Sequence, residues 1–207
     1  ALALGLTERA TVDNRTFPQL RFVESELQAI EKTLPHSVAL LNQDFTPERV
    51  QQELNTTAYP IIHIATHGQF RPDADDTFLV TGYDPARQSQ KLTITGLDQI
   101  IRSTKSRNPI ELLVLSACQT AAGDDRAALG LAGIAAQAGA KSVLASLWTV
   151  NDQATAQLVS EFYTGLFQKE LSKAKALQAA QRSLIAEGGG TAHPYYWAPF
   201  ILIGNWL

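Results

Sequence analysis

The chain has 207 residues, of which 45% are hydrophobic and 18% are charged, and this balance is typical of one globular domain. The 17 lysines and arginines stand against 20 aspartates and glutamates, so the net charge is −3 and no basic surface for nucleic acid is expected. No apolar run approaches the roughly 20 residues of a membrane-spanning helix, and the single cysteine excludes an intrachain disulfide and favours a reducing, cytoplasmic location.

Strands and helices alternate along the chain. Apolar and β-branched runs predict the strands, and apolar residues at helical spacing, preceded by capping residues, predict the helices. In chain order, the sequence predicts a strand at 1–6, a helix at 19–34, a strand at 38–41, a helix at 47–54, a strand at 61–66, a short strand at 77–81 that pairs with 91–94, a helix at 96–103, a strand at 110–115, a helix at 127–138, a strand at 142–147, helices at 152–167 and 173–186, and a strand at 200–203.

This alternation predicts an α/β fold with a mostly parallel central sheet and helices on both faces. There is no internal repeat and no low-complexity linker, so residues 1–207 are expected to form a single domain. The chain contains no methionine and begins inside a predicted strand. We therefore expect it to be the C-terminal part of a longer protein.

Two residues with chemical potential follow predicted strands. His67 and Gly68 come directly after the strand at 61–66, and Cys118, the only cysteine, follows the strand at 110–115. Because functional sites of parallel sheets lie beyond the carboxyl ends of the strands, His67 and Cys118 are expected to meet. A thiol can attack a carbonyl carbon, and histidine is suited to transfer the proton. The alternative is that Cys118 is an ordinary buried cysteine.

Other polar residues have weaker signals. His63 lies inside the same predicted strand as His67, and we interpret it as a core residue. One cysteine and four scattered histidines cannot form a structural zinc site, so no metal or other cofactor is expected for the chemistry. An acidic cluster soon after His67 could bind calcium or a basic substrate, with a solvated loop as the alternative; it consists of Asp73, Asp75 and Asp76.

Several segments, in order along nearly the whole chain, resemble the CHAT-domain family. They are 63–68 (HIATHG), 113–120 (LVLSACQT), 129–133 (LGLAG), 138–142 (AGAKS), 147–152 (LWTVND) and 193–198 (HPYYWA). The 51 residues from His67 to Cys118 also resemble the spacing of about 50 residues in caspases. One departure is that caspases have a glycine two residues after the cysteine, where this chain has Thr120.

The resemblance implies a caspase-like three-layer sandwich and a cysteine endopeptidase that acts on a protein or peptide substrate. It implies His67 and Cys118 as the catalytic dyad, with a thioester intermediate. The backbone N–H groups of Gly68 and Cys118 would stabilise the oxyanion, and a backbone carbonyl rather than a third side chain would orient His67. The family also implies an upstream regulatory region, such as tetratricopeptide-type repeats, or a regulatory protein.

Two other functions are compatible with the same fold. One is a catalytically silent interaction or regulatory module, and the other is a different thiol enzyme, such as an acyl transferase or amidase. The presence of both His67 and Cys118 favours the endopeptidase. No nucleic acid and no membrane are expected as partners.

The segment 147–152 also resembles a stretch of separases in which an acidic residue binds an arginine before the cut bond. By this resemblance, Asp152 forms the floor of a substrate pocket and Trp148 its apolar wall. The alternative is that Asp152 caps the helix that follows it. Both roles are compatible if Asn151 is the cap and Asp152 turns inward.

Overall fold

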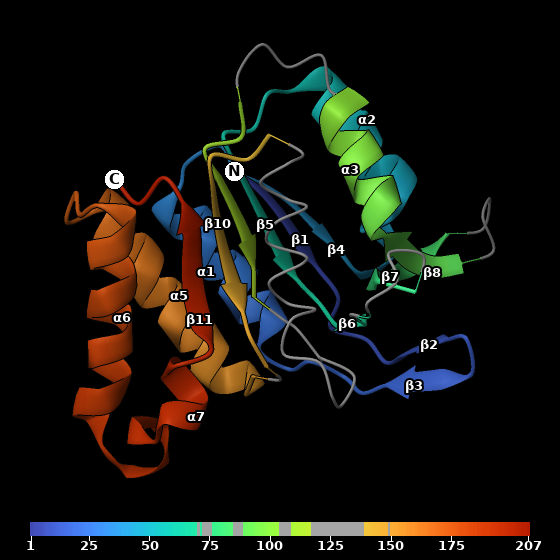
Figure 1. The fold of residues 1–207 in the computed structure, drawn as a ribbon. Coiled ribbons are helices and arrows are strands. Elements are labelled where there is room, and N and C mark those ends of the chain that lie inside the picture. The colour runs from blue at the N-terminus through green and yellow to red at the C-terminus, as the bar shows by residue number, and fades with distance from the viewer. Residues whose placement is uncertain (70, 72–75, 85–88, 104–108, 117–138, 149) are drawn as a thin grey trace.

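A computed structural model describes residues 1–207 except 70, 72–75, 85–88, 104–108, 117–138 and 149. A six-stranded sheet with the strand order β11-β10-β9-β5-β1-β4 forms its centre (Figure 1). Only β11 runs antiparallel to its neighbour, so the predicted mostly parallel sheet is confirmed. The strands are β1 (Leu2–Gly5), β4 (Val38–Leu41), β5 (Ile61–Ala65), β9 (Leu112–Leu115), β10 (Ser142–Ser146) and β11 (Phe200–Gly204).

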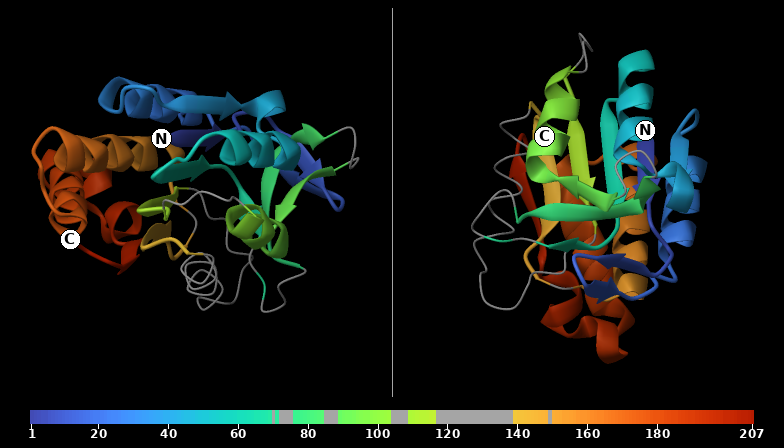
Figure 2. Two further views of the ribbon diagram at one scale, coloured as in Figure 1. Left: turned by 90° about the horizontal axis from the view of Figure 1, so that it is seen from above. Right: turned by 90° about the vertical axis from the view of Figure 1, so that its right-hand side faces the viewer.

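Helices cover both faces of this sheet, which gives three layers (Figures 1 and 2). Alternation along β1 shows the two cores: Leu2 and Leu4 pack on one side, and Ala3 packs on the other. The core with Leu2 and Leu4 includes side chains from α2 (Pro47–Thr56) and α3 (Ile94–Ser103). The core with Ala3 includes side chains from α1 (Val23–Thr33), α5 (Asp152–Phe167) and α6 (Lys173–Glu187).

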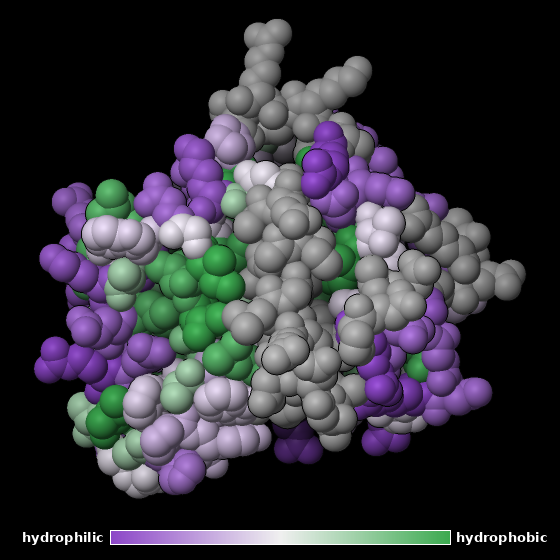
Figure 3. Space-filling view, viewed as in Figure 1, coloured by the Kyte–Doolittle hydropathy of each residue, from purple (hydrophilic) through white to green (hydrophobic). Residues whose placement is uncertain are grey.

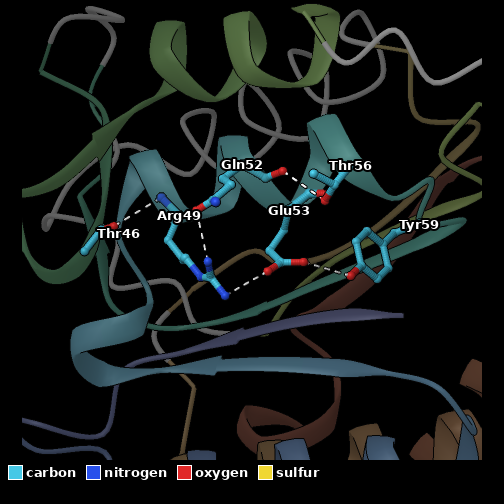
Figure 4. A network of polar contacts seen from close by, with 6 residues as sticks. All are labelled: Thr46, Arg49, Gln52, Glu53, Thr56 and Tyr59. Atoms are coloured by element: carbon cyan, nitrogen blue, oxygen red, sulfur yellow. Dashed lines mark hydrogen bonds and ion pairs between the residues drawn. The ribbon is translucent and has the colours of Figure 1, made fainter.

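The start of α2 follows from local capping chemistry, as the sequence predicts. The Thr46 side chain accepts a hydrogen bond from the Arg49 N–H, and Pro47 occupies the first turn. Arg49 and Glu53 form an ion pair of 3.1 Å, and the Tyr59 hydroxyl donates to Glu53 over 3.2 Å (Figure 4). This network joins α2 to the segment that leads into β5.

The sequence did not predict a small hairpin near the amino terminus. It consists of β2 (Ala10–Val12) and β3 (Arg15–Phe17), joined by Asp13 and Asn14, whose φ angles are 48° and 62°. Two residues with positive φ are typical of the tight turns that match the twist of a hairpin.

A separate three-stranded sheet consists of β6 (Gly68–Gln69), β7 (Phe78–Asp84) and β8 (Ser89–Thr93). The predicted pairing of 77–81 with 91–94 is thereby confirmed, although β7 is longer than expected. The helix predicted at 127–138 lies outside the described residues.

The remaining short elements are η1 (Asn42–Asp44), η2 (Gly189–Ala192) and α7 (Pro194–Trp197). Apolar side chains reach the surface over β11, where Ile201 and Ile203 are half-buried (Figure 3). Within the described part of the chain, no helix combines the length and apolar character needed to cross a bilayer.

Candidate active site at the carboxyl edge of the sheet

His67 lies just beyond the carboxyl end of β5, and two hydrogen bonds hold this turn against β7. The Thr66 hydroxyl donates to the Val80 carbonyl over 2.6 Å, and the Val80 N–H donates to the His67 carbonyl over 2.8 Å. His67 is only 7% exposed. Its backbone is fixed by the neighbouring sheet, and the residue is largely buried.

A backbone carbonyl orients the His67 ring, in the way that the family resemblance implies. The carbonyl of Pro18 lies 2.8 Å from His67 Nε2. Because a carbonyl only accepts hydrogen bonds, Nε2 carries the hydrogen, and Nδ1 of the neutral ring is left as an acceptor. The Phe17 ring packs against the imidazole with 5.5 Å between the ring centroids. The end of β3 and the residue after it thus set the position of the ring.

Burial lowers the pKa of His67 below its ordinary value of 6.5. The Pro18 carbonyl and the charge of Asp152 oppose this shift in pKa, and the charge of Arg15 adds to it. The imidazole is therefore neutral near pH 7, which is the form that can accept a proton.

Asp152 is close to the same site, although it comes from the segment after β10. Its Oδ2 accepts a hydrogen bond of 2.9 Å from the Phe22 N–H, at the start of α1. Phe22 itself makes no side-chain cap there, so the carboxylate of Asp152 serves the amino terminus of α1, where negative charge is favourable. The segment 18–22 thus contacts both His67 and Asp152.

The structure shows which residue caps α5, a question that the sequence left open between Asn151 and Asp152. Asn151 is the cap of α5, because its side chain accepts from the Ala154 N–H over 3.0 Å. The hypothesis that Asp152 caps its own helix is wrong. With Asn151 as the cap, Asp152 has no capping role in α5.

Burial raises the pKa of Asp152, and the negative charge of Glu26 acts in the same direction. The N–H groups of Phe22 and Arg21 and the charge of His67 oppose this rise in pKa. The carboxylate is thus half-buried and incompletely compensated. A cation would find a favourable partner in such a group.

Trp148 is half-buried, and its indole N–H donates to the carbonyl of Tyr195 over 3.2 Å, in α7. The hydrogen bonds of the described residues therefore connect Trp148 with Tyr195 rather than with Asp152.

Gly68 begins β6 opposite Leu79. The bond from the Val80 N–H to the His67 carbonyl makes Gly68 and Leu79 a pair without hydrogen bonds between them, so the Gly68 N–H points away from β7.

Some predicted site residues lie outside the described part of the chain. Cys118, Asp73 and Asp75 are among them, and Asp76 is exposed. Among the residues that the structure describes, no group of three or more histidine, cysteine or acidic side chains could hold a metal ion. A cavity of about 510 Å³ lies elsewhere, between η1, the start of α2 and the end of β7, and its lining includes neither His67 nor Asp152.

The sequence interpretation missed the residues that position the site. Pro18 and Phe22 act through backbone groups, so their identity carries no signal of these contacts. The predicted helix at 19–34 begins only at Val23, and in the segment before it the N–H of Leu20 donates to the Thr7 carbonyl. Glu26 did carry a signal in the sequence, since it is an acid inside the apolar stripe of that helix. The structure shows that it is only 2% exposed.

Solved structures with the same fold include the complex of the pro- and mature domains of RgpB from Porphyromonas gingivalis, with a TM-score of 0.54 and 11% identity. A secreted C11 cysteine protease from Bacteroides thetaiotaomicron, in complex with an irreversible peptide inhibitor, has a TM-score of 0.55 and 13% identity. The matches cover 99% and 98% of this chain, but only 47% and 65% of those chains. At this identity the likeness shows the fold, which is caspase-like.

Among curated proteins, none is similar enough to this chain to count as a relative. The family model of the CHAT domain matches residues 2–205, nearly the entire chain. The chain therefore belongs to the CHAT-domain family.

Proposed function

We propose that the chain is a caspase-like cysteine endopeptidase in which His67 is the general base and acid and Cys118 is the nucleophile. The observation that carries this proposal is the state of His67: its Nε2–H is bound to the Pro18 carbonyl over 2.8 Å, and burial lowers its pKa. A neutral, oriented imidazole with Nδ1 available is what an adjacent thiol needs for activation.

The pairing of β5 with β9 supports the partnership of His67 and Cys118. Residues paired across these strands are 51 positions apart, as Ile64 and Leu115 are. His67 follows Ile64 by three positions, and Cys118 follows Leu115 by three. Because β5 and β9 are parallel, the segments that follow them leave the sheet at the same edge.

The proposed reaction begins when the Cys118 thiol gives its proton to His67 Nδ1. The sulfur attacks the scissile carbonyl carbon, and the N–H groups of Gly68 and Cys118 stabilise the oxyanion. The ladder geometry that turns the Gly68 N–H away from β7 supports its part in this role. The C–N bond then breaks as His67 protonates the leaving amine, and water hydrolyses the thioester.

Asp152 is the proposed specificity residue, and an arginine or lysine before the cut bond is the proposed preference. The half-buried carboxylate lies close enough to His67 for each to affect the pKa of the other. Its Oδ2 is engaged by Phe22, and the remaining lone pairs can accept from a guanidinium or ammonium group. Trp148 is the proposed apolar wall for the stem of that side chain.

Regulation by an upstream region, such as tetratricopeptide-type repeats, or by a regulatory protein is part of the proposal. The family resemblance supports it, and a cytoplasmic location is proposed with it. We expect low activity from residues 1–207 alone and higher activity when upstream sequence and its activating signal are present. Full activity of the isolated chain, unchanged by upstream sequence, would speak against this regulation.

The test is covalent labelling by a peptidyl electrophile with arginine in the first position, followed by intact mass. Wild type should gain one adduct, whereas Cys118→Ala should gain none and His67→Gln should react far more slowly. Absence of labelling in wild type and in the longer protein would favour the silent interaction module instead. Labelling without any peptide cleavage would favour a different thiol enzyme.

A further inference from the structure

A chain of three buried polar side chains lies behind the candidate site and takes no part in the proposed chemistry. His63 Nε2 lies 2.9 Å from a carboxylate oxygen of Glu26, and His63 Nδ1 lies 3.2 Å from the Tyr163 hydroxyl. Their exposed fractions are 2% for Glu26, 0% for His63 and 1% for Tyr163. Fully buried polar groups are costly unless each has a hydrogen-bond partner, so these three side chains depend on one another for their hydrogen bonds.

The direction of the hydrogen bonds follows from the partners. A carboxylate accepts, so His63 Nε2–H donates to Glu26, and in the neutral ring His63 Nδ1 then accepts from the Tyr163 hydroxyl. Burial, and secondly the charge of Glu26, raise the pKa of Tyr163 well above its ordinary value, so the phenol stays protonated and donates. Every polar atom named here then has a partner.

The three residues come from the three elements that meet under the candidate site. Glu26 is in α1, His63 is in β5 and Tyr163 is in α5. Helices α1 and α5 lie side by side on the same face of the sheet (Figures 1 and 2).

Each of these elements leads to one part of the site. Strand β5 ends two residues before His67, and α5 begins with Asp152. The residues just before α1 hold both groups, through the Pro18 carbonyl and the Phe22 N–H.

We propose that Glu26, His63 and Tyr163 are positioning residues that fix α1 against β5 and α5, so that the segment 18–22 holds the His67 ring and the Asp152 carboxylate at the same time. The importance of this positioning for catalysis rests on the proposed endopeptidase function. Small displacements of a catalytic group lower the rate by large factors. The loss of one hydrogen bond among these three side chains should therefore slow the reaction at the site.

The first readout needs no enzymatic activity. In protein with isotope-labelled histidine, the His67 Nε2–H that donates to Pro18 gives a proton resonance that His67→Gln identifies by its loss. We expect this resonance to persist in wild type, in Glu31→Ala, which changes an exposed acid of the same helix, and in Glu26→Gln, whose amide oxygen still accepts from His63. We expect it to be lost or broadened in Glu26→Leu and in Tyr163→Phe, with circular dichroism confirming that both variants are folded.

The second readout is the rate of labelling of Cys118 by the arginine-containing electrophile. Tyr163→Phe should slow it about tenfold or more, and Glu26→Gln and Glu31→Ala should not. Tyr163→Phe decides the outcome if Glu26→Leu does not fold, because it removes a single oxygen and keeps the ring. An unchanged His67 resonance and labelling rate in folded Tyr163→Phe would overturn the positioning role. Loss of the resonance in Tyr163→Phe, with no labelling of wild type even when upstream sequence and its activating signal are present, would instead overturn the endopeptidase and leave the positioning role standing.

Discussion

Substitutions at Asn151 and Asp152 should separate helix capping from substrate recognition. Asn151→Ala removes the oxygen that accepts from the Ala154 N–H over 3.0 Å, which should lower the free energy of unfolding by about 1 kcal/mol. Asp152→Ala removes the acceptor of the Phe22 N–H at the amino terminus of α1, so a loss of about 1 kcal/mol is expected there as well. The two alanine variants should therefore be similarly destabilised, for different reasons.

Asp152→Asn is the informative third variant. Its amide oxygen still accepts from the Phe22 N–H, and removal of the charge also removes the burial cost that raises the pKa of Asp152, which offsets the lost interaction with the helix terminus. The asparagine carries no charge for a guanidinium group. This variant should therefore keep most of the stability and lose the preference for arginine or lysine, whereas Asn151→Ala should keep the preference.

Urea denaturation followed by tryptophan fluorescence measures the stability, and cleavage of a peptide library by an activated form measures the preference. A preference for basic residues that persists in Asp152→Asn would refute the pocket. Equal destabilisation of Asp152→Asn and Asp152→Ala would refute the assignment of the hydrogen bond to Phe22 as the stabilising contact.

Three further predictions concern stability and cofactors. Because the pKa of folded His67 lies below its ordinary value of 6.5, the unfolded chain binds a proton more readily than the folded chain below about pH 6.5. The free energy of unfolding should therefore fall as the pH drops through that range. The fall should be smaller in His67→Gln. Gly82→Ala places a methyl group 2.0 Å from the Asn42 carbonyl oxygen, so it should lower the free energy of unfolding, measured in urea, by at least about 2 kcal/mol. Gly190→Ala is the control: its methyl group meets no atom within 4 Å, and the free energy of unfolding should change by no more than about 0.5 kcal/mol. A chelator should leave the labelling rate of Cys118 unchanged, and a loss restored by Zn²⁺ would contradict the metal-free mechanism.

The elements of the central sheet could be predicted because their signals are local. Four consecutive apolar residues at 38–41 and the Thr46-Pro47 start of α2 carry their structure in their own sequence, and both occur as expected. The β2–β3 hairpin was missed because its strands have only three residues each, too few to show a period.

The contacts that build the site could not be predicted in the same way. The Pro18 carbonyl and His67 are 49 positions apart, and Phe22 and Asp152 are 130 apart. Such pairs arise from how the layers pack, and the contributing groups at Pro18 and Phe22 are backbone atoms that every sequence possesses. The sequence predicts which side chains reach the carboxyl edge, but not the segment that holds them there.

The distance between Cys118 Sγ and His67 Nδ1 in a crystal structure of the protein tests the central claim most directly. The account predicts that both side chains face one crevice at the carboxyl edge of the sheet, within about 3–7 Å of each other, since dyads are often loose without substrate. It also predicts that His67 Nε2 remains bound to the Pro18 carbonyl. A Cys118 thiol packed in the core and directed away from His67 would contradict the dyad and, with it, the proposed endopeptidase.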